Sequence, residues 1–391
     1  MNGPDGCAQR PGFLMVANWP SDVGYAWWLM ESFWVTLAKH YHEEYRAIIA
    51  FPSLRTLSES ISSSPIAVVE QDFRAPGIAS LLSQLRFLRR HRIRVMYLTD
   101  WRTWSLRYAL FRLAGVRRIV THDHTPGTRT TPRGVKRTVK RALNQVRWWA
   151  VDGAFGATDF VRKRLVDVGC MPAHRCYAVP NGIPDQCRID TSSVPAPELL
   201  LNCDDCLMVM VARANRYKNI DFVLDCLVEC KRRSFTGVRF LFIGDGPDLG
   251  YFKSRSVELG VSDSCIWLGF RTDVQKMLTY ADFAIHPSSG EVGYSLSILE
   301  YMAAGLPVLV PDDPSVCLAT KHGETGFRFP KGEVARATDL IIRMCGDESS
   351  RRAMGRRAKH LVGDEYDLCR THSALVTAFN HVLQERCFGL D

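Results

Sequence analysis

The feature that most constrains the fold is a repeated alternation of short apolar runs with longer amphipathic stretches. Short apolar runs bounded by turn residues indicate strands, and apolar residues at i, i+3 and i+4 indicate helices packed on one face. Such alternation predicts β-α units around a parallel sheet. The strands expected in the first half are Phe13–Ala17, Tyr45–Phe51, Ile66–Glu70, Val95–Leu98, Arg118–Thr121, Gly153–Gly156 and Tyr177–Val179. The helices expected between them are Tyr25–Lys39, Ile78–Arg90, Ser105–Leu113, Val135–Arg147 and Asp159–Val168.

A second series of the same kind begins near residue 205, after a segment rich in Pro, Asp and Ser, Asn181–Asp204, that is typical of an interdomain connection. Its expected strands are Leu207–Val211, Arg239–Ile243, Cys265–Leu268, Phe283–His286 and Pro307–Val310. Its expected helices are Ile220–Arg232, Leu249–Leu259, Val274–Tyr280 and Ser297–Ala304, followed by consecutive helices over Glu333–Leu383. Because 391 residues exceed one ordinary core, the sequence predicts two doubly wound α/β domains.

The sequence carries no pattern of a targeting signal over Met1–Pro11, and no run approaches the roughly 20 apolar residues of a membrane-spanning helix. Thirteen scattered cysteines without an export signal predict reduced thiols in a cytosol. Cys203 and Cys206 are close in sequence, but no second pair completes a zinc site. We therefore expect a cytoplasmic protein, soluble or peripheral to the inner face of a membrane, with no bound metal.

Basic charge is concentrated in the first half, where residues 1–185 hold 26 Lys and Arg against 14 Asp and Glu. The stretch Arg129–Arg147 has seven basic residues and no acid, and Trp148 and Trp149 follow it. A basic amphipathic helix ending in tryptophans favours contact with an anionic membrane, and a solvated helix face is the equal alternative. Nucleic-acid binding is not expected, because no recognition module accompanies the charge.

Two cations, Arg213 and Lys218, follow a strand of the second series. The carboxyl ends of parallel strands are where an α/β sheet binds ligands, and a diphosphate requires cations. By itself, the pair is more typical of a solvated basic loop. Gly244-Asp245-Gly246-Pro247 follows the next strand, where a glycine turn can admit a phosphate to backbone N–H groups or can simply form the turn.

A longer motif runs from His286 to Val308 and carries a glutamate on its loop, Glu291, and another on its helix, Glu300. Carboxylates accept paired hydrogen bonds from sugar or ribose diols, and the first amides of the helix can hold a diphosphate. Glu300 stands among apolar residues, which predicts burial, and a buried carboxylate needs a partner. The alternative is a helix residue satisfied by solvent.

This order of motifs resembles the GT-B glycosyltransferases of family 4, also called glycosyl transferases group 1. The resemblance is strong over residues 153–365, includes Val179-Pro-Asn-Gly-Ile183, and holds only in outline over the first 150. It implies the GT-B fold, with two Rossmann-like doubly wound domains facing a cleft and C-terminal helices. The implied domains are 1–185, which binds the acceptor, 186–365, which binds the nucleotide-sugar donor, and a C-terminal helix, 366–391, that crosses back to the first domain.

The resemblance also implies roles for the residues. Arg213 and Lys218 would contact the donor diphosphate and offset leaving-group charge, Glu300 would bind the ribose, and Glu291 would face the transferred sugar. Gly244 and the backbone of Tyr294, Ser295 and Leu296 would approach the donor. In the first domain, Gly24 would lie near the donor, and His122, beside Asp123, would lie near the transferred sugar; a structural histidine is the alternative.

One departure from the family pattern concerns the two glutamates, because Glu291 and Glu300 are separated by eight residues where the family has seven. We assign Glu291 to the first position by assuming a one-residue bulge after it, and Val292 is the competing position. The activity implied is retaining transfer of a sugar from a nucleotide sugar to a hydroxyl acceptor, such as a lipid-linked or cell-envelope glycan, without an obligatory metal. Alternatives are a nucleotide-sugar epimerase or hydrolase of the same fold, and a non-catalytic nucleotide-binding module.

Overall fold

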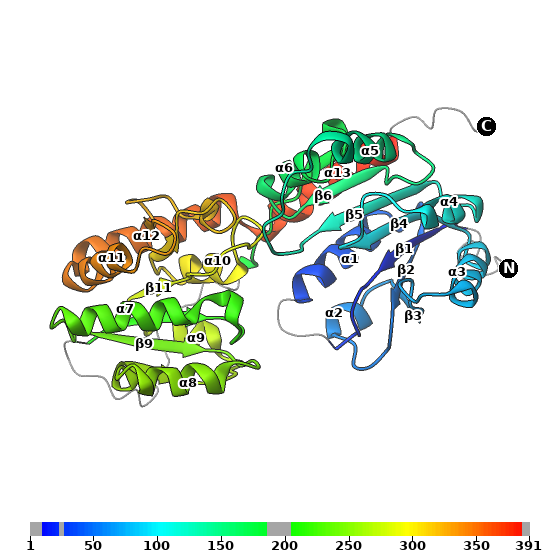
Figure 1. Cartoon of the computed structure of the whole chain (residues 1–391). Helices are drawn as coiled ribbons and strands as arrows, with labels where there is room; N and C mark the ends of the chain where they lie inside the picture. Colours follow the sequence, from blue (N-terminus) through cyan, green and yellow to red (C-terminus); the bar gives the residue numbers. More distant parts are fainter. Residues whose placement is uncertain (1–9, 23–26, 186–204, 385–391) are drawn as a thin grey trace. The chain divides into compact units, whose positions relative to one another are not determined.

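The computed structural model describes residues 10–22, 27–185 and 205–384 of the chain. These residues form two compact units, each with its own β-sheet and helices (Figure 1). The first unit takes in the described residues up to Thr125, from Arg129 to Asn181 and from Thr371 onward. The second takes in Gly182–Arg370 and the short segment Pro126–Thr128. In the described part of the chain, no helix has both the length and the apolar character needed to cross a membrane.

The sheet of the first unit has seven parallel strands in the order β3-β2-β1-β4-β5-β6-β7. The order reverses direction between β1 and β4, as in a doubly wound fold. The strands are β1 (Gly12–Val16), β2 (Arg46–Phe51), β3 (Ala67–Glu70), β4 (Ile93–Thr99), β5 (Arg118–Asp123), β6 (Gly153–Gly156) and β7 (Cys176–Ala178). The helices are α1 (Trp28–His40), α2 (Glu59–Ser62), α3 (Ile78–Arg90), α4 (Leu106–Leu113), α5 (Gly134–Gln145) and α6 (Asp159–Asp167).

The second unit repeats this plan with six parallel strands in the order β10-β9-β8-β11-β12-β13. The strands are β8 (Cys206–Val211), β9 (Val238–Ile243), β10 (Cys265–Trp267), β11 (Phe283–Ile285), β12 (Val308–Pro311) and β13 (Gly326–Phe329). The helices are α7 (Ile220–Arg232), α8 (Leu249–Glu258), α9 (Val274–Leu278), α10 (Leu296–Ala303), α11 (Val334–Gly346) and α12 (Glu348–Glu365), with a short 3-10 helix, η4 (Arg216–Lys218), before α7.

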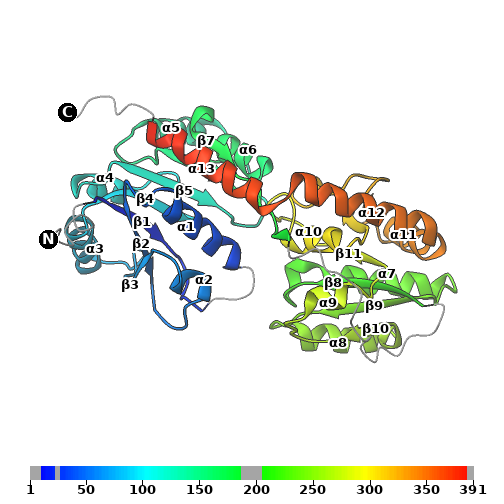
Figure 2. The same ribbon diagram turned by 180° about the vertical axis from the view of Figure 1, so that it is seen from behind.

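The last helix, α13 (Leu368–Gln384), completes the core of the first unit although it follows the second in sequence. Figure 2 shows it, in red, beside α1 on one face of the sheet. Phe379 is wholly buried, and its ring centroid lies 5.3 Å from that of Tyr97 in β4 and 5.1 Å from that of Phe155 in β6. The hydroxyl of Tyr41 donates a 2.7 Å hydrogen bond to the side chain of Asn380. Apolar and polar contacts therefore both hold α13 in the first unit.

The predicted α/β class with two parallel sheets is confirmed, and each expected strand is present in the sheets. Central strands such as β1 and β5 are buried at every residue, as in parallel sheets covered on both faces. Two elements were not predicted: the edge strand β13 and the single-turn helix α2. Each has four residues.

Candidate functional site

Three loops of the second unit carry most of the candidate residues. The loop after β8 holds Arg213 and Lys218, the turn after β9 holds Gly244, and the loop after β11 holds Glu291. Strands β9, β8 and β11 are neighbours in the sheet. Because all three are parallel, their carboxyl ends lie at the same edge, which is the edge where open α/β sheets bind ligands.

Lys218 and Glu291 form a buried ion pair at this edge. The Nζ atom of Lys218 lies 2.5 Å from Oε1 of Glu291, and the two residues are only 8% and 7% exposed. The hydroxyl of Ser288 donates a 2.8 Å hydrogen bond to the same oxygen, and Nε2 of His286 lies 3.5 Å from it. The sequence analysis identified the two charged residues as site residues but did not identify Ser288 and His286. Their position directly after β11 was the signal that could have identified them.

Burial and the ion pair together set the charges of this cluster. Burial by itself raises the pKa of Glu291, but the contacts with His286 and Lys218 outweigh it and hold that pKa well below its usual range. Burial lowers the pKa of His286 more than the neighbouring carboxylate raises it. At neutral pH the cluster therefore contains an ionised carboxylate beside a neutral imidazole.

The loops after β8 and β11 are also joined by an uncharged contact. Asn219 adopts a left-handed conformation, with φ of 59°, between η4 and α7. Its side-chain amide donates a 3.3 Å hydrogen bond to the carbonyl of Pro287.

A buried ion pair such as Lys218–Glu291 contributes little net stability, because desolvation offsets the attraction between the charges. The pair is therefore better explained as fixing the positions of two side chains than as stabilising the fold.

Glu300 lies on the buried side of α10 and is 4% exposed, as its apolar neighbours predicted. Its carboxylate makes no hydrogen bond or ion pair with another residue in the described part of the chain. Burial raises its pKa to about 7. A buried carboxyl group without a partner is costly, and it would be satisfied by hydroxyl donors from a ligand.

Tyr301, the neighbour of Glu300, was not predicted from the sequence. Its hydroxyl donates a 3.1 Å hydrogen bond to the carbonyl of Val211 and accepts a 2.5 Å hydrogen bond from the amide of the same residue. Val211 is the last residue of β8, so this side chain connects α10 to the start of the loop that carries the two cations. The ring is wholly buried. Tyr301 therefore positions that loop relative to Glu300.

Arg213 is exposed, unlike Lys218. Its guanidinium makes no hydrogen bond or ion pair with any described residue. Arg216, on the same loop, is held by Asp221 and Asp248 at 3.5 and 4.0 Å, and its guanidinium lies 3.5 Å from the ring centroid of Tyr251. Arg213 is thus the cation of this loop that is available to a ligand.

Gly244 has the structural role of a turn residue, which is one of the two alternatives that the sequence left open. A Cβ atom at this position would lie 2.0 Å from the carbonyl oxygen of Ala212, and the backbone φ is +144°. The amide of Gly244 donates a 2.8 Å hydrogen bond to the carbonyl of Gly269, and the amide of Ala214 donates to the carbonyl of Asp245 at 2.9 Å. The turn therefore packs directly under the Arg213 loop, and its first amide is already used within the protein.

The amino end of α10 is where the predicted backbone contacts lie. Ser295 caps the helix by accepting a 3.3 Å hydrogen bond from the amide of Ser297. The amides of Ser295 and Leu296 donate to no acceptor in the described part of the chain. The side chain of Tyr294 is buried, and its ring packs edge-on against Tyr366 at 5.2 Å. This helix end therefore presents amide donors, as helix N-termini that bind anions do.

The irregular spacing between the two glutamates coincides with two glycines in left-handed conformations. Gly290 and Gly293 have φ of 79° and 111°, and they flank Glu291 and Val292. The carboxylate of Glu291 points to Lys218, while Val292 is half-buried. The placement of Glu291 is thus compatible with the assumed bulge, and its contact with a sugar stays a prediction.

In the first unit, the structure places His122 inside the core rather than at the surface. The residue is 0% exposed, its Nδ1 lies 2.6 Å from the hydroxyl of Tyr97, and its ring stacks on Phe33 at a centroid distance of 5.4 Å. Burial, with a smaller effect of His124, holds its pKa well below the usual range. The ring is therefore neutral, its packing is that of a structural histidine, and its catalytic role stays a prediction.

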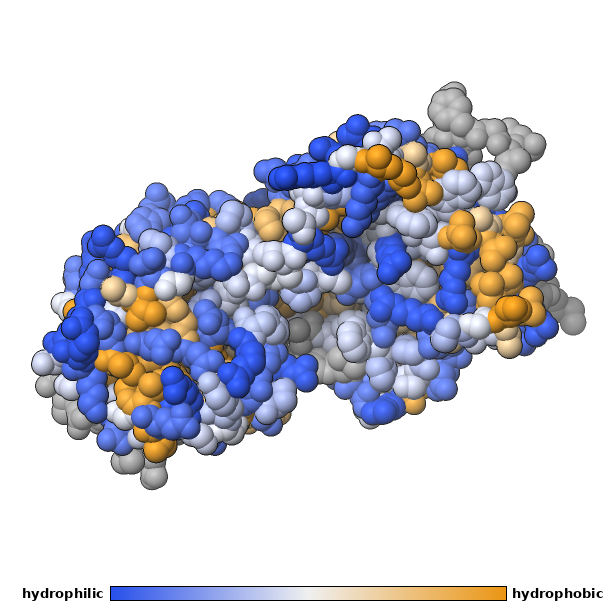
Figure 3. Space-filling view, viewed as in Figure 1, coloured by the Kyte–Doolittle hydropathy of each residue, from blue (hydrophilic) through white to orange (hydrophobic). Residues whose placement is uncertain are grey.

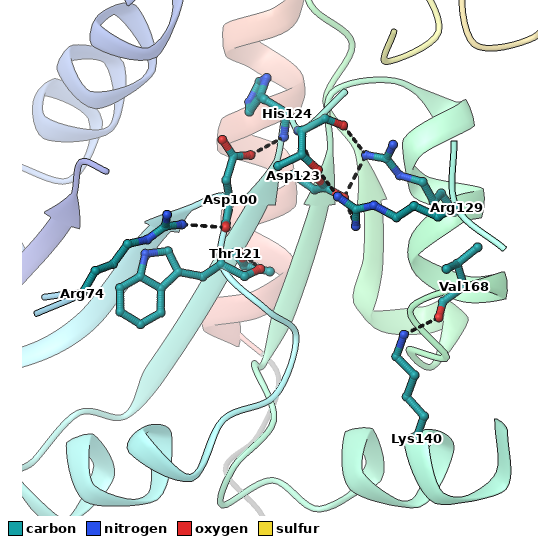
Figure 4. A network of polar contacts seen from close by, with 11 residues as sticks. Arg74, Asp100, Thr121, Asp123, His124, Arg129, Lys140 and Val168 are labelled. Carbon is teal, nitrogen blue, oxygen red and sulfur yellow. Dashed lines mark hydrogen bonds and ion pairs between the residues drawn. The ribbon is translucent and has the colours of Figure 1, made fainter. Parts of the chain in front are cut away.

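The residues beside His122 belong to a polar network (Figure 4). Asp123 receives a 3.0 Å hydrogen bond from Arg164, and the amide of His124 donates a 2.7 Å hydrogen bond to Asp100. Burial raises the pKa of Asp100 to about 6, although the hydrogen bond from the His124 amide lowers it. The predicted contact residue Gly24 lies outside the described residues. The first unit thus holds a network of charged groups at the carboxyl ends of β4 and β5.

Comparison with known proteins finds relatives for a part of the chain. Residues 196–361 match the family model of glycosyl transferases group 1. The N-acetyl-alpha-D-glucosaminyl L-malate synthase of Bacillus anthracis is 24% identical over 179 residues, which are 46% of this chain and 46% of that protein. The alpha-monoglucosyldiacylglycerol synthase of Acholeplasma laidlawii is 30% identical over 132 residues, 33% of this chain and 33% of that protein. The chain therefore spans less than half the length of these curated relatives.

Solved structures match over almost the whole chain. A glycosyltransferase from Rickettsia africae superposes with a TM-score of 0.76 at 14% identity, covering 97% of this chain and 100% of that one. HepE of Anabaena in complex with UDP-glucose superposes with a TM-score of 0.69 at 16% identity, covering 94% and 99%. At such low identity these likenesses concern the fold. Residues 196–361 therefore belong to the glycosyl transferases group 1 family, and the chain as a whole has the GT-B fold.

Proposed function

We propose that the protein is a retaining glycosyltransferase that moves a sugar from a nucleotide-sugar donor to a hydroxyl group of an acceptor. The observation that carries the proposal is the arrangement in the second unit of an uncommitted cation, a buried Lys218–Glu291 pair and an isolated buried Glu300. Such a set offers separate partners for a diphosphate, a sugar and a ribose. The HepE complex with UDP-glucose supports a nucleotide sugar as the donor.

Each residue has a role in this proposal. Arg213 and Lys218 bind the diphosphate of the donor, and the amides of Ser295 and Leu296 add donors from the start of α10. Glu300 accepts hydrogen bonds from the ribose hydroxyls, which relieves the cost of its burial. The Gly244 turn supports the loop that carries the cations.

Glu291 and His122 are proposed to act nearest the transferred sugar. Glu291 stays ionised because of its contacts with His286 and Lys218, so it can only accept hydrogen bonds. Nε2 of His122 is buried and has no hydrogen-bond partner in the described part of the chain.

The chemistry of transfer would depend on stabilising the charge that develops on the departing nucleoside diphosphate. Preorganised cations are effective in this role because they need no reorganisation at the moment of reaction. Arg213 and Lys218 supply two positive charges at the predicted position of the diphosphate. We therefore propose that turnover needs no metal ion and is unchanged by EDTA.

We also propose that the acceptor is a lipid-linked or cell-envelope glycan and that the protein works at the cytoplasmic face of a membrane, contacting anionic lipid through Arg129–Arg147. On α5, Val135 and Val139 are 79% and 51% exposed among basic residues, and Trp148 beyond it is 45% exposed. Figure 3 shows apolar side chains gathered at the surface over α5 and, on the same face, over α3 and α4. Exposed apolar groups beside cations are the combination that binds a membrane surface.

The decisive experiment is a thermal-shift screen of nucleotide sugars, followed by assays of nucleoside diphosphate release with and without envelope glycan fractions. A nucleotide sugar that binds the native state should raise the melting temperature. Arg213→Gln should lower turnover about 100-fold without changing the melting temperature of the free protein. Arg216→Gln, a neighbouring cation already held by acids, is the control and should keep turnover within a few-fold.

Three outcomes would overturn parts of this proposal. If no nucleotide sugar raises the melting temperature, the donor site is wrong. If diphosphate release needs no acceptor, the protein is a hydrolase. If NMR of the product shows an inverted anomeric configuration, the retaining mechanism is wrong.

A further inference from the structure

A pocket of about 690 Å³ opens in the first unit, and none of its lining residues is among those assigned to the donor. It lies at the carboxyl ends of β4 and β5 and is closed by α5 and by α6 with the turn that follows it. Its volume is in the range of sites that hold small molecules, roughly 300–1,000 Å³. Every lining residue belongs to the first unit.

Cations outnumber acids in the lining. The acids are Asp100 and Asp123, and the cations are Arg102, Arg129, Lys136, Lys140 and Arg164. The acids are engaged within the protein. Asp123 accepts hydrogen bonds from Arg164 at 3.0 Å and from Thr125 at 2.5 Å, and Asp100 accepts one from the amide of His124 at 2.7 Å (Figure 4). The pocket therefore keeps an excess of positive charge.

Two of the cations have no partner. The side chains of Arg102 and Lys136 make no hydrogen bond or ion pair with any described residue. Lys140 donates a 2.6 Å hydrogen bond to the carbonyl of Val168, with no acid beside it. Burial lowers the pKa of Lys140, and the charges of Lys136 and Arg129 lower it further, in accord with crowded cations. An anion entering the pocket would relieve this crowding.

Most of the remaining lining is apolar. Trp101 and Trp104 come from the loop after β4, Val139 and Leu143 from α5, and Leu165 from α6. A free inorganic anion would leave these groups without a partner, whereas an apolar substituent on the anion would cover them.

We propose that this pocket binds a phosphate ester carrying an apolar group, with the phosphate on Arg102, Lys136 and Lys140 and the apolar group against Trp104, Val139 and Leu143. Two sources share this chemistry: a single amphiphilic phosphate that enters as a small molecule, and the head group of a lipid held in a bilayer. The binding itself is independent of the donor site. Only the assignment of the ligand as the acceptor that receives the sugar rests on the proposed function.

The test is calorimetric titration of the full chain, without nucleotide sugar, with decyl phosphate below its micellar concentration. Inorganic phosphate and decanol serve as the charged and apolar halves of the probe. We expect decyl phosphate to bind at least about tenfold more tightly than either half. Lys136→Gln and Arg102→Gln should each weaken binding roughly tenfold, the effect of losing one charge-assisted hydrogen bond.

Matched controls lie on the same helix. Arg137 and Val135 are exposed on α5 and do not line the pocket. Arg137→Gln should leave the affinity for decyl phosphate within about twofold, since it removes the same charge outside the pocket. Val135→Asp should likewise leave the affinity for decyl phosphate nearly unchanged, whereas Val139→Asp should abolish binding. Val135 and Val139 are both exposed, so neither substitution should prevent folding.

The outcomes separate the two sources and the two proposals. If Lys136→Gln and Arg137→Gln reduce the affinity for decyl phosphate equally, the ligand binds to a diffuse basic surface, and the proposal that it binds in the pocket is wrong. Equal affinity for inorganic phosphate and decyl phosphate would show that the apolar residues of the pocket do not contribute to binding. If vesicles of phosphatidylglycerol bind with a greater dependence on Lys136 than on Arg137 while monomeric decyl phosphate does not bind, the head group of a bilayer lipid is the ligand of the pocket. None of these results depends on Arg213, so the donor assignment can fail or hold separately.

Discussion

The ammonium group of Lys218 lies 2.5 Å from a carboxylate oxygen of Glu291, across a sequence separation of 73 residues. This contact joins the loop after β8 to the loop after β11. Both side chains are nearly inaccessible to solvent, so neither charge has water as a substitute partner. The two predicted site residues, Lys218 at the diphosphate and Glu291 at the transferred sugar, therefore form a single unit in the folded protein.

Removing one member of this pair should destabilise the protein as well as stop catalysis. Lys218→Met leaves the Glu291 carboxylate buried with only Ser288 and His286 beside it. We expect a loss of about 3–5 kcal/mol in the free energy of unfolding, measured by urea denaturation. The double variant Lys218→Met with Glu291→Gln should lose less than the sum of the two single changes. Additive losses would show that the two groups do not interact in solution.

Glu300 should make stability depend on pH. Its pKa is raised from 4.5 to about 7 in the folded protein, so the folded state favours the protonated form. The associated stability is present below pH 4.5 and is lost as the pH rises through about 7. Glu300→Gln removes this loss and should be more stable than the native protein at pH 8 by at most ~3 kcal/mol. Melting temperatures measured from pH 4 to 8 check this; parallel curves would contradict a raised pKa.

Tyr301→Phe should weaken the connection between α10 and β8. The change leaves the amide and the carbonyl of Val211 without the hydroxyl that now bonds to both. We expect a cost of ~1–3 kcal/mol in unfolding free energy. We also expect a higher KM for the nucleotide sugar, because the loop that carries Arg213 begins at Val211. Unfolding and steady-state kinetics measure the two effects. A change in stability with an unaltered KM would mean that Tyr301 does not position the loop.

The sequence predicted elements better than it predicted contacts. Strand and helix positions follow from local periodicity and apolar runs, and the short apolar run of β13 is interrupted by Arg328. The burial of Glu300 was predicted correctly from its apolar neighbours. The contact between Lys218 and Glu291 could not be predicted, because it depends on which strands become neighbours in the sheet. The complete burial of His122 likewise depends on Phe33 and Tyr97, from distant elements.

Gly244→Ala should be strongly destabilising because two effects add. The new Cβ would meet the carbonyl of Ala212 at 2.0 Å, and the residue has a positive φ. We expect a loss of roughly 3 kcal/mol or more. Gly332→Ala is the matched control, since Gly332 also has a positive φ, of +81°, but has nothing within 4 Å of the added atom. It should cost only about 1 kcal/mol. Equal losses in the two variants would exclude the close approach as the cause.

The basic face of α5 should bind anionic vesicles through charges that do not line the pocket. Arg137 and Arg141 are exposed and four residues apart on α5. Reversing both to Glu should weaken co-sedimentation with phosphatidylglycerol vesicles at low salt by roughly 30-fold or more, since each cation near such a surface contributes about 1 kcal/mol. Reversing Arg352 and Arg356, exposed at the same spacing on α12, is the control and should have little effect.

Salt distinguishes this electrostatic attachment from apolar insertion. At about 1 M salt the screening length falls to roughly 3 Å, so binding that depends on Arg137 and Arg141 should be lost. Residual binding at high salt that disappears in Val135→Asp would assign it to the exposed apolar residues of the helix. Binding that survives both the charge reversal and high salt, or that falls equally in the α12 control, would rule out α5 as the attachment surface.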